Sequence, residues 1–203
     1  MVGGQSLRMG GGIKSLNIFN GKTIFDRILA QLKKQTQKII INSNDIDKAF
    51  IKYKLPIIKD HKIGYLGPLS GIHSSMRWLI KNDPIVNWLV TVPGDTPFIP
   101  DDFISRFKSR MSGGSKIILA QSNAKTHPII GAWHVSLFEH LDKHLSNDET
   151  RKIITWANNH PIEYEKFKTE NFDPFFNINF KEDLLQAEKI EKAFIAKKKF
   201  EKL

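Results

Sequence analysis

Short apolar runs alternate along the chain with longer amphipathic segments. Four runs are rich in β-branched residues and are closed by polar or turn residues: 38–42, 56–60, 88–92 and 116–120. Continuous apolar runs of this length are typical of strands buried on both faces. Between them, apolar residues recur at helical spacing, which predicts helices over 23–36, 69–81 and 100–111.

This order of strands and helices predicts an α/β fold with three layers and a mainly parallel sheet, connected by right-handed crossovers. We find no linker, repeat or low-complexity segment, so we expect one domain over residues 1–203, in which 188–203 form a basic helical tail. Ligands of such sheets bind beyond the carboxyl ends of the strands. The polar positions to inspect are therefore the loop after Val2, Asn42, Asp60 and Asp95.

Composition narrows the class of protein. The 203 residues are 40% hydrophobic and 26% charged, as in an ordinary globular protein. No apolar run approaches the ~18 residues of a membrane span, and the start lacks the pattern of a signal peptide, so we expect a cytoplasmic protein without a membrane partner. The chain contains no cysteine, which excludes disulfides, cysteine-based metal sites and a thiol nucleophile.

The net charge of +10 comes mainly from 25 lysines, against 6 arginines, spread over the whole chain. Proteins that read base edges rely on the arginine fork, so this pattern favours solvated surface lysines over nucleic-acid binding. We predict no nucleic-acid partner. The tail over 188–203 has six Lys and three Glu, and therefore supplies +3 of the total.

The opening loop carries the strongest local signal. Residues 3–12 contain five glycines, and the loop has two cations, Arg8 and Lys14, but no acid. Glycines let backbone N–H groups approach a ligand, so the loop resembles a cradle for a polyphosphate; the alternative is a flexible loop with incidental charges. The P-loop pattern does not fit, because Ile13 stands before Lys14, and Gly21-Lys22-Thr23 is more simply a turn at Asn20-Gly21.

Gly-Gly-x-x-x-Arg-Met-Gly-x-x-x-Lys, followed by Asn-Gly-Lys, resembles the signature loop of Rossmann-like nucleotidyltransferases. The double glycine resembles the molybdenum cofactor guanylyltransferases of the molybdopterin nucleotidyltransferase family. The likeness covers residues 1 to about 193 and continues in order through Asn42, Asp60, Gly67-Pro68-Leu69-Ser70-Gly71, Gly94-Asp95-Thr96-Pro97, His127-Pro128 and Asn177-Ile178-Asn179. It implies a three-layer α/β/α sandwich of the nucleotide-diphospho-sugar transferase type.

The resemblance also implies roles for individual residues. Lys14, Arg8 and Asp95 would be catalytic, with the two cations on the triphosphate and Asp95 binding Mg²⁺. The nucleotide would be held by Met1, Val2, Gly3, Gly4, Lys14, Asn42, Asp60, Gly67, Pro68, Leu69 and Asp95. Nucleotidyl transfer needs a divalent cation and fixed positive charge as pyrophosphate departs, which agrees with these roles. The alternative for Asp95 is the acid of an Asx turn.

On the acceptor side, the resemblance implies that His127, Asn177 and Asn179 face the pterin; for each, a turn or an internally satisfied polar residue is the alternative. The implied reaction transfers GMP from Mg·GTP to molybdopterin, with transient contact to molybdoenzymes or their chaperones. Two alternatives stay open: a sister enzyme with another base or acceptor, such as a molybdopterin cytidylyltransferase or a sugar-phosphate nucleotidyltransferase, and a nucleotide-binding module without turnover.

The chain departs from the family pattern in two places. Ile13 stands where the family has an acid before the loop lysine. In addition, a hydrophobic strand leads into the glycine loop of the family, whereas only Met1 and Val2 precede Gly3 here. We expect that lack of this strand leaves unpaired backbone groups and an apolar trench beneath the helices.

Overall fold

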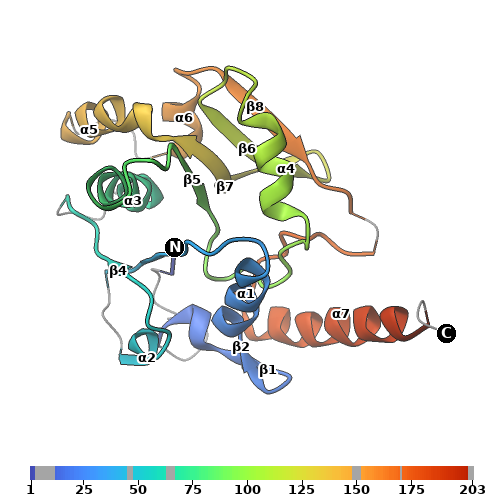
Figure 1. Ribbon diagram of the computed structural model, residues 1–203. Coiled ribbons are helices and arrows are strands. Elements are labelled where there is room, and N and C mark those ends of the chain that lie inside the picture. The colour runs from blue at the N-terminus through green and yellow to red at the C-terminus, as the bar shows by residue number, and fades with distance from the viewer. Residues whose placement is uncertain (3–11, 45–47, 63–66, 148–151, 170, 201–203) are drawn as a thin grey trace.

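The computed structural model describes residues 1–2, 12–44, 48–62, 67–147, 152–169 and 171–200 (Figure 1). The helices are α1 (Ile24–Lys33), α2 (Lys48–Ile51), α3 (Pro68–Asn82), α4 (Phe103–Arg110), α5 (Phe138–Ser146), α6 (Ile153–Ala157) and α7 (Lys181–Phe200). The strands are β1 (Ile18–Phe19), β2 (Lys22–Thr23), β3 (Ile41–Asn42), β4 (Ile57–Ile58), β5 (Trp88–Thr91), β6 (Ile117–Ser122), β7 (Lys125–His134) and β8 (Ile162–Lys166).

The sheet consists of a four-stranded part, in the order β5-β7-β6-β8, and a parallel pair, β3 and β4. The backbone of Met1 and Val2 connects the two parts. The Met1 amine donates to Val92 O at 2.9 Å, Gly94 N–H donates to Met1 O at 2.7 Å, and Val2 N–H donates to Asn42 O at 2.9 Å. The two Met1 bonds have the parallel pattern, and the pairings show that β5, β6 and β8 share one direction and that β3 and β4 are parallel to each other.

Strand β7 runs against its neighbours β5 and β6. It follows β6 through a two-residue turn in which Asn123 and Ala124 have φ of 47° and 59°. Two consecutive left-handed residues form the tight hairpin turn that matches the twist of the strands. The sheet is therefore mixed but mainly parallel, as the order of elements predicts.

Helices cover both faces of the sheet (Figure 1). Ile118 and Ala120 of β6 belong to a core cluster that also contains side chains of α1, α4 and α7. Ile117 and Leu119, which point to the opposite face, belong to a second cluster with α3, α5 and α6. This alternation confirms the predicted three layers.

The predicted strand over 38–42 is wrong in length, because only Ile41 and Asn42 are paired as β3. Ile39 and Ile40 have the expected residue type, but they line a cavity between β3 and β5. In the described part of the chain, no strand pairs with Ile39 and Ile40 on the side of this cavity. They are therefore not assigned to a strand, because a strand is defined by its hydrogen-bonded partner.

Helix α1 begins where the sequence predicts a turn. Asn20 and Gly21 have φ of 44° and 74° and connect β1 to β2. Thr23 then caps the helix: its hydroxyl accepts from Asp26 N–H, while the Asp26 carboxylate accepts from the Thr23 backbone. Gly21-Lys22-Thr23 is therefore a hairpin turn and helix start.

The longest described helix, α7, spans 20 residues and includes most of the basic tail. Lysine and glutamate recur along it. Among the helices in the described ranges, none combines the length and the apolar character that crossing a bilayer requires.

Candidate functional site

Three predicted site residues lie at one edge of the sheet. Asn42 ends β3, Asp60 follows β4, and Asp95 follows β5. The backbone of Met1 and Val2 binds both Asn42 and Gly94, so the ends of these strands are adjacent. This is the edge at which parallel sheets bind ligands.

Lys14 lies between two predicted partners at this edge. It begins a 3₁₀ turn over Lys14–Leu16, and its Nζ is 2.5 Å from Asp95 Oδ2 and 2.5 Å from Asn179 Oδ1. The side chains of Lys14 and Asp95 are 20% and 19% exposed. The ammonium group is thus held in place yet still accessible to an anion from solvent.

Residues 173–179, which we call the strap, run from one part of the site to the other. Ile178 N–H donates to Asp95 O at 3.0 Å, and Thr96 Oγ1 donates to Asn177 Oδ1 at 3.0 Å. The strap therefore brings Asn177 and Asn179 beside Asp95, as their common assignment to the site requires.

At the other end of the strap, His127 is part of a hydrogen-bonded chain. Its Nε2 lies 2.7 Å from Ser122 Oγ, which in turn lies 2.7 Å from Asp173 Oδ1. The Asp173 carboxylate only accepts, so it receives the single hydroxyl hydrogen of Ser122, and His127 Nε2–H must donate to the hydroxyl oxygen. The ring also packs edge-on against Phe175, with centroids 4.9 Å apart.

The protonation of His127 follows from its surroundings. Burial lowers its pKa, and Lys125 acts in the same direction, whereas the Asp173 carboxylate opposes the shift. The neutral ring is therefore favoured near pH 7. With Nε2 as the donor, Nδ1 of the neutral ring carries the lone pair and is an acceptor.

A bulge in β7 places His127. The pairing with β6 moves from Leu119 and Gly131 directly to Ala120 and His127, so residues 128–130 of β7 have no opposite partner. Pro128 lies in this bulge, where its missing N–H costs no ladder bond. Bulges of this kind redirect neighbouring side chains.

Around Asp60, the edge carries a network of amides and one carboxylate. Asn42 Nδ2 donates to Asp60 Oδ1 at 2.9 Å. Asn44 Nδ2 donates to Asp60 Oδ2 at 3.0 Å, and Asn44 Oδ1 accepts from Asp60 N–H at 2.8 Å. Sequence reasoning missed Asn44, although it follows Asn42 by two residues in the same loop.

Helix α3 points its first turn toward this network. Gly67, with φ of 67°, precedes Pro68 at the first helical position. A Cβ on Gly71 would lie 2.4 Å from Asn42 Oδ1, so glycine permits the close approach. The Leu69 side chain is fully buried in the core, so only its backbone could meet a ligand.

Gly3, Gly4 and Arg8 lie outside the described residues. Ile13, at the end of the loop, packs against the cluster formed by Val2, Phe25 and others. Where the resembling family has an acid, this chain therefore has an apolar residue that packs against a core cluster.

The donor atoms near Asp95 suit Mg²⁺. Within the described ranges no group of three or more His, Cys, Asp or Glu side chains gathers. Asp95 supplies one carboxylate, and Asn177 and Asn179 supply amide oxygens next to it. Mg²⁺ takes one or two carboxylates and completes its shell with phosphate oxygens and water, so the residues fit a metal that arrives with a nucleotide.

Comparison with known proteins shows to which family the chain is similar. A family model described as a MobA-like NTP transferase domain matches residues 1–162. A protein of Nitrobacter hamburgensis, named molybdenum cofactor guanylyltransferase, is 37% identical over 191 residues, which cover 94% of this chain and 91% of the relative.

Solved structures agree in fold. Molybdopterin-guanine dinucleotide biosynthesis protein A from Archaeoglobus fulgidus superposes with a TM-score of 0.74 at 22% identity, over 95% of this chain and 96% of that one. A 4-diphosphocytidyl-2C-methyl-D-erythritol synthase from Anaerococcus prevotii gives a TM-score of 0.66 at 12% identity, over 86% and 88%. At these identities the likeness concerns the fold, and it confirms the predicted nucleotide-diphospho-sugar transferase type.

Proposed function

The chain belongs to the MobA-like NTP transferase family, and from this membership we propose that it transfers GMP from GTP to molybdopterin, forming molybdopterin guanine dinucleotide. The observation that carries the proposal is the position of Lys14, with its Nζ between Asp95 and Asn179 at the carboxyl edge of the sheet. The negative charge of a departing pyrophosphate is stabilised by a cation that is fixed in place and accessible from solvent, as the Lys14 ammonium group is.

In this reaction a terminal phosphate oxygen of molybdopterin attacks the α-phosphorus of GTP. The bond from that phosphorus to the α–β bridging oxygen breaks, and pyrophosphate leaves with the electron pair. No protein nucleophile is required. The contribution of the protein is to align the two phosphates and to stabilise negative charge in the transition state.

Asp95 would hold Mg²⁺, with Asn177 and Asn179 offering oxygens beside it. When bound, the metal neutralises charge on the phosphates. Lys14 supplies a second, permanent positive charge. Arg8, outside the described residues, is proposed to act with Lys14 on the triphosphate.

Specificity would be divided between the two ends of the site. Asn42 and Asp60, supported by Asn44, would hold the nucleoside. His127, Asn177 and Asn179 would face the pterin, with His127 Nδ1 accepting a hydrogen bond. We further propose that the enzyme acts in the cytoplasm, without nucleic acid or membrane, and passes its product on through transient contact with molybdoenzymes or their chaperones.

The test is turnover by the purified chain with Mg²⁺, GTP and molybdopterin, followed by pyrophosphate release and by detection of the dinucleotide product. We expect release only when both substrates are present, and at least ~10-fold less when CTP replaces GTP, because a site that pairs with one base leaves polar groups unpaired with another. Nucleotide binding without any release, or equal rates with CTP, would contradict the proposal.

A further inference from the structure

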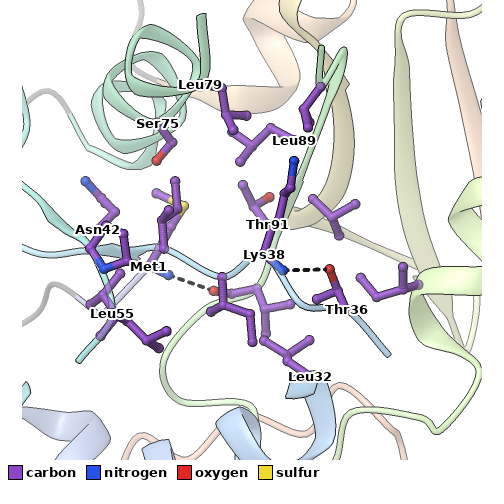
Figure 2. Close-up of a pocket in the computed structure, with 18 of the residues that line it drawn as sticks. Met1, Leu32, Thr36, Lys38, Asn42, Leu55, Ser75, Leu79, Leu89 and Thr91 are labelled. Carbon is purple, nitrogen blue, oxygen red and sulfur yellow. Dashed lines mark hydrogen bonds between the residues drawn. The ribbon is translucent and has the colours of Figure 1, made fainter. Parts of the chain in front are cut away.

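Residues 59–62, which we call the Asp60 loop, extend past the end of their strand. β4 ends at Ile58, whose carbonyl oxygen accepts from Ser43 N–H at 2.9 Å. Asp60 lies two residues beyond this bond, so its position depends on hydrogen bonds that side chains make. Figure 2, which looks into the cavity between β3 and β5, shows its partner Asn42 beneath α3.

Two helices hold the Asp60 loop. At α3, His61 N–H donates to Ser74 Oγ at 2.7 Å. At α5, Lys62 Nζ donates to Asp142 O at 2.8 Å and to Ser146 Oγ, and it lies 3.1 Å from Asp142 Oδ1. An ammonium group has three hydrogens, so these three oxygens use all of them. The Lys62 side chain is 19% exposed and is committed to α5.

Asp142 is itself bonded to a fully buried histidine. His73 of α3 has no exposed surface, and its Nε2 lies 2.9 Å from Asp142 Oδ1. The hydrogen bond from Lys62 is the main cause that lowers the pKa of the Asp142 carboxyl, so this group is ionised and only accepts. His73 Nε2–H is therefore the donor. The ring stacks on Phe138 with centroids 4.8 Å apart, and burial lowers its pKa, which favours the neutral form.

The helices α3 and α5 give this contact a fixed frame. Met76 of α3 and Leu141 of α5 are fully buried in the same core cluster. Side chains packed at the density of a protein core do not shift independently. The Asp142 carboxylate is thus fixed relative to the core, and Lys62 bonds to it from a position two residues after Asp60.

We propose that Lys62 is a positioning residue for nucleotide binding: through Asp142 it fastens the Asp60 loop to α5 and so holds the Asp60 carboxylate where it meets the nucleoside. This inference rests on the proposed function, in which Asp60 contacts the nucleoside of GTP. Without the contact to α5 the loop adopts further positions. The apparent affinity for GTP then falls by the fraction of molecules in which Asp60 is correctly placed.

The experiment compares Lys62→Met with Lys59→Met. Lys59 is exposed and precedes Asp60 in the same loop, so the control removes the same charge from the same segment. In Lys62→Met we expect the KM for GTP to rise ~5-fold, while kcat and the KM for molybdopterin stay within ~2-fold. The control should stay within ~2-fold in all three constants, as is usual for an exposed side chain. Lys62→Arg keeps a cation for Asp142 and should recover most of the affinity.

Asp142→Asn tests whether Lys62 acts through α5. The amide keeps an oxygen for His73 Nε2–H but lacks the charge that attracts Lys62, so the variant should fold and its KM for GTP should rise ~3-fold. The double variant of Lys62→Met and Asp142→Asn should be no weaker than Lys62→Met alone, because changes at the two ends of one contact are not additive. Additive losses would overturn the proposal, since Lys62 would then act on the nucleotide by another route.

Hydrogen exchange without nucleotide provides a readout that is independent of the proposed function. The amide of Asp60 is bonded to Asn44 Oδ1 and that of His61 to Ser74 Oγ. Both amides should exchange ~5-fold faster in Lys62→Met than in Lys59→Met, because the loop opens more often when it is released from α5.

Unchanged exchange of these two amides in Lys62→Met would overturn the proposal. So would an unchanged KM for GTP in Lys62→Met when Asp60→Ala raises it, and the proposed function would then stand. If Asp60→Ala also leaves the KM for GTP unchanged, the assignment of Asp60 to the nucleoside is wrong, and the inference falls with it. If Lys62→Met fails to fold, Asp142→Asn decides by the same two readouts.

Discussion

The two ends of the site differ in how many strands support them. Asp95 follows β5 and His127 lies in β7 of the four-stranded ladder β5-β7-β6-β8, whereas Asn42 ends β3 and Asp60 follows β4 in the short pair. The backbone of Met1 and Val2 connects the pair to the larger sheet by hydrogen bonds. The proposed nucleoside end is therefore connected to the larger sheet by few backbone contacts, while the proposed phosphate and acceptor end lies on that sheet itself.

The largest expected effect concerns the phosphate end. Lys14→Ala and Asp95→Ala should each lower kcat by ~100- to 1,000-fold, the usual scale for removing a preorganised electrostatic group. Steady-state rates measure this, and the melting temperature should change little because both side chains lie at the partly exposed edge.

Lys22→Ala is the matched control, since Lys22 is an exposed lysine of β2, whereas Lys14 is paired with Asp95. If Lys22→Ala lowered kcat as much as Lys14→Ala, general loss of positive charge would explain the effect. Full Mg²⁺-dependent activity of Asp95→Ala would move the metal to another carboxylate.

The second effect concerns the buried amine of Met1 and the stability of the chain. An unfolded amine has a pKa near 8.0, and burial lowers that of Met1 to about 6, so between these values the unfolded chain binds more protons than the native chain. The free energy of unfolding of the chain should therefore rise as the pH increases from 6 to 8, by about 3 kcal/mol at most.

Denaturant unfolding at several pH values measures this rise. Acetylation of the Met1 amine removes this titrating group but keeps all histidines, so the acetylated chain should lose the Met1 share of the slope. An identical pH dependence in both chains would show that the Met1 amine is not buried.

The third effect distinguishes the proposed GTP end of the site from the proposed molybdopterin end through their KM values. Asp60→Ala leaves the amides of Asn42 and Asn44 without their shared acceptor, so the KM for GTP should rise ~10-fold or more while that for molybdopterin stays within ~2-fold. His127→Phe keeps a buried ring but removes the acceptor, and it should show the reverse split. If either variant changed both KM values equally, the division of labour would be wrong.

The smallest effect tests the orientation of His127. Ser122→Ala removes the hydroxyl that fixes the Nε2–H form, and we expect a loss of only ~3- to 10-fold in kcat/KM for molybdopterin. Because burial lowers the pKa of His127, wild-type activity should be constant near neutral pH and fall only after acidification protonates Nδ1. An unchanged acidic limb in His127→Phe would assign that limb to another group.

Sequence patterns predicted the parts of this molecule that depend on local order. Asn42, Asp60 and Asp95 each follow an apolar run, so their common edge follows from the strand–helix alternation. Asn44, Ser122 and Asp173 could not be identified in this way, because their partners are set by tertiary packing; Ser122 and Asp173 are 51 residues apart. Strand β7 reverses at a turn without glycine, which removes the usual hairpin signal.

Recognition of guanine is tested most directly by equilibrium binding of GTP, ATP, CTP and UTP to the chain in the presence of Mg²⁺. All four carry the same triphosphate, so the phosphate end contributes equally and the differences report the nucleoside end alone. We expect GTP to bind at least ~10-fold more tightly than CTP, with the preference reduced in Asp60→Ala. Equal affinities for GTP and CTP would contradict a guanylyltransferase.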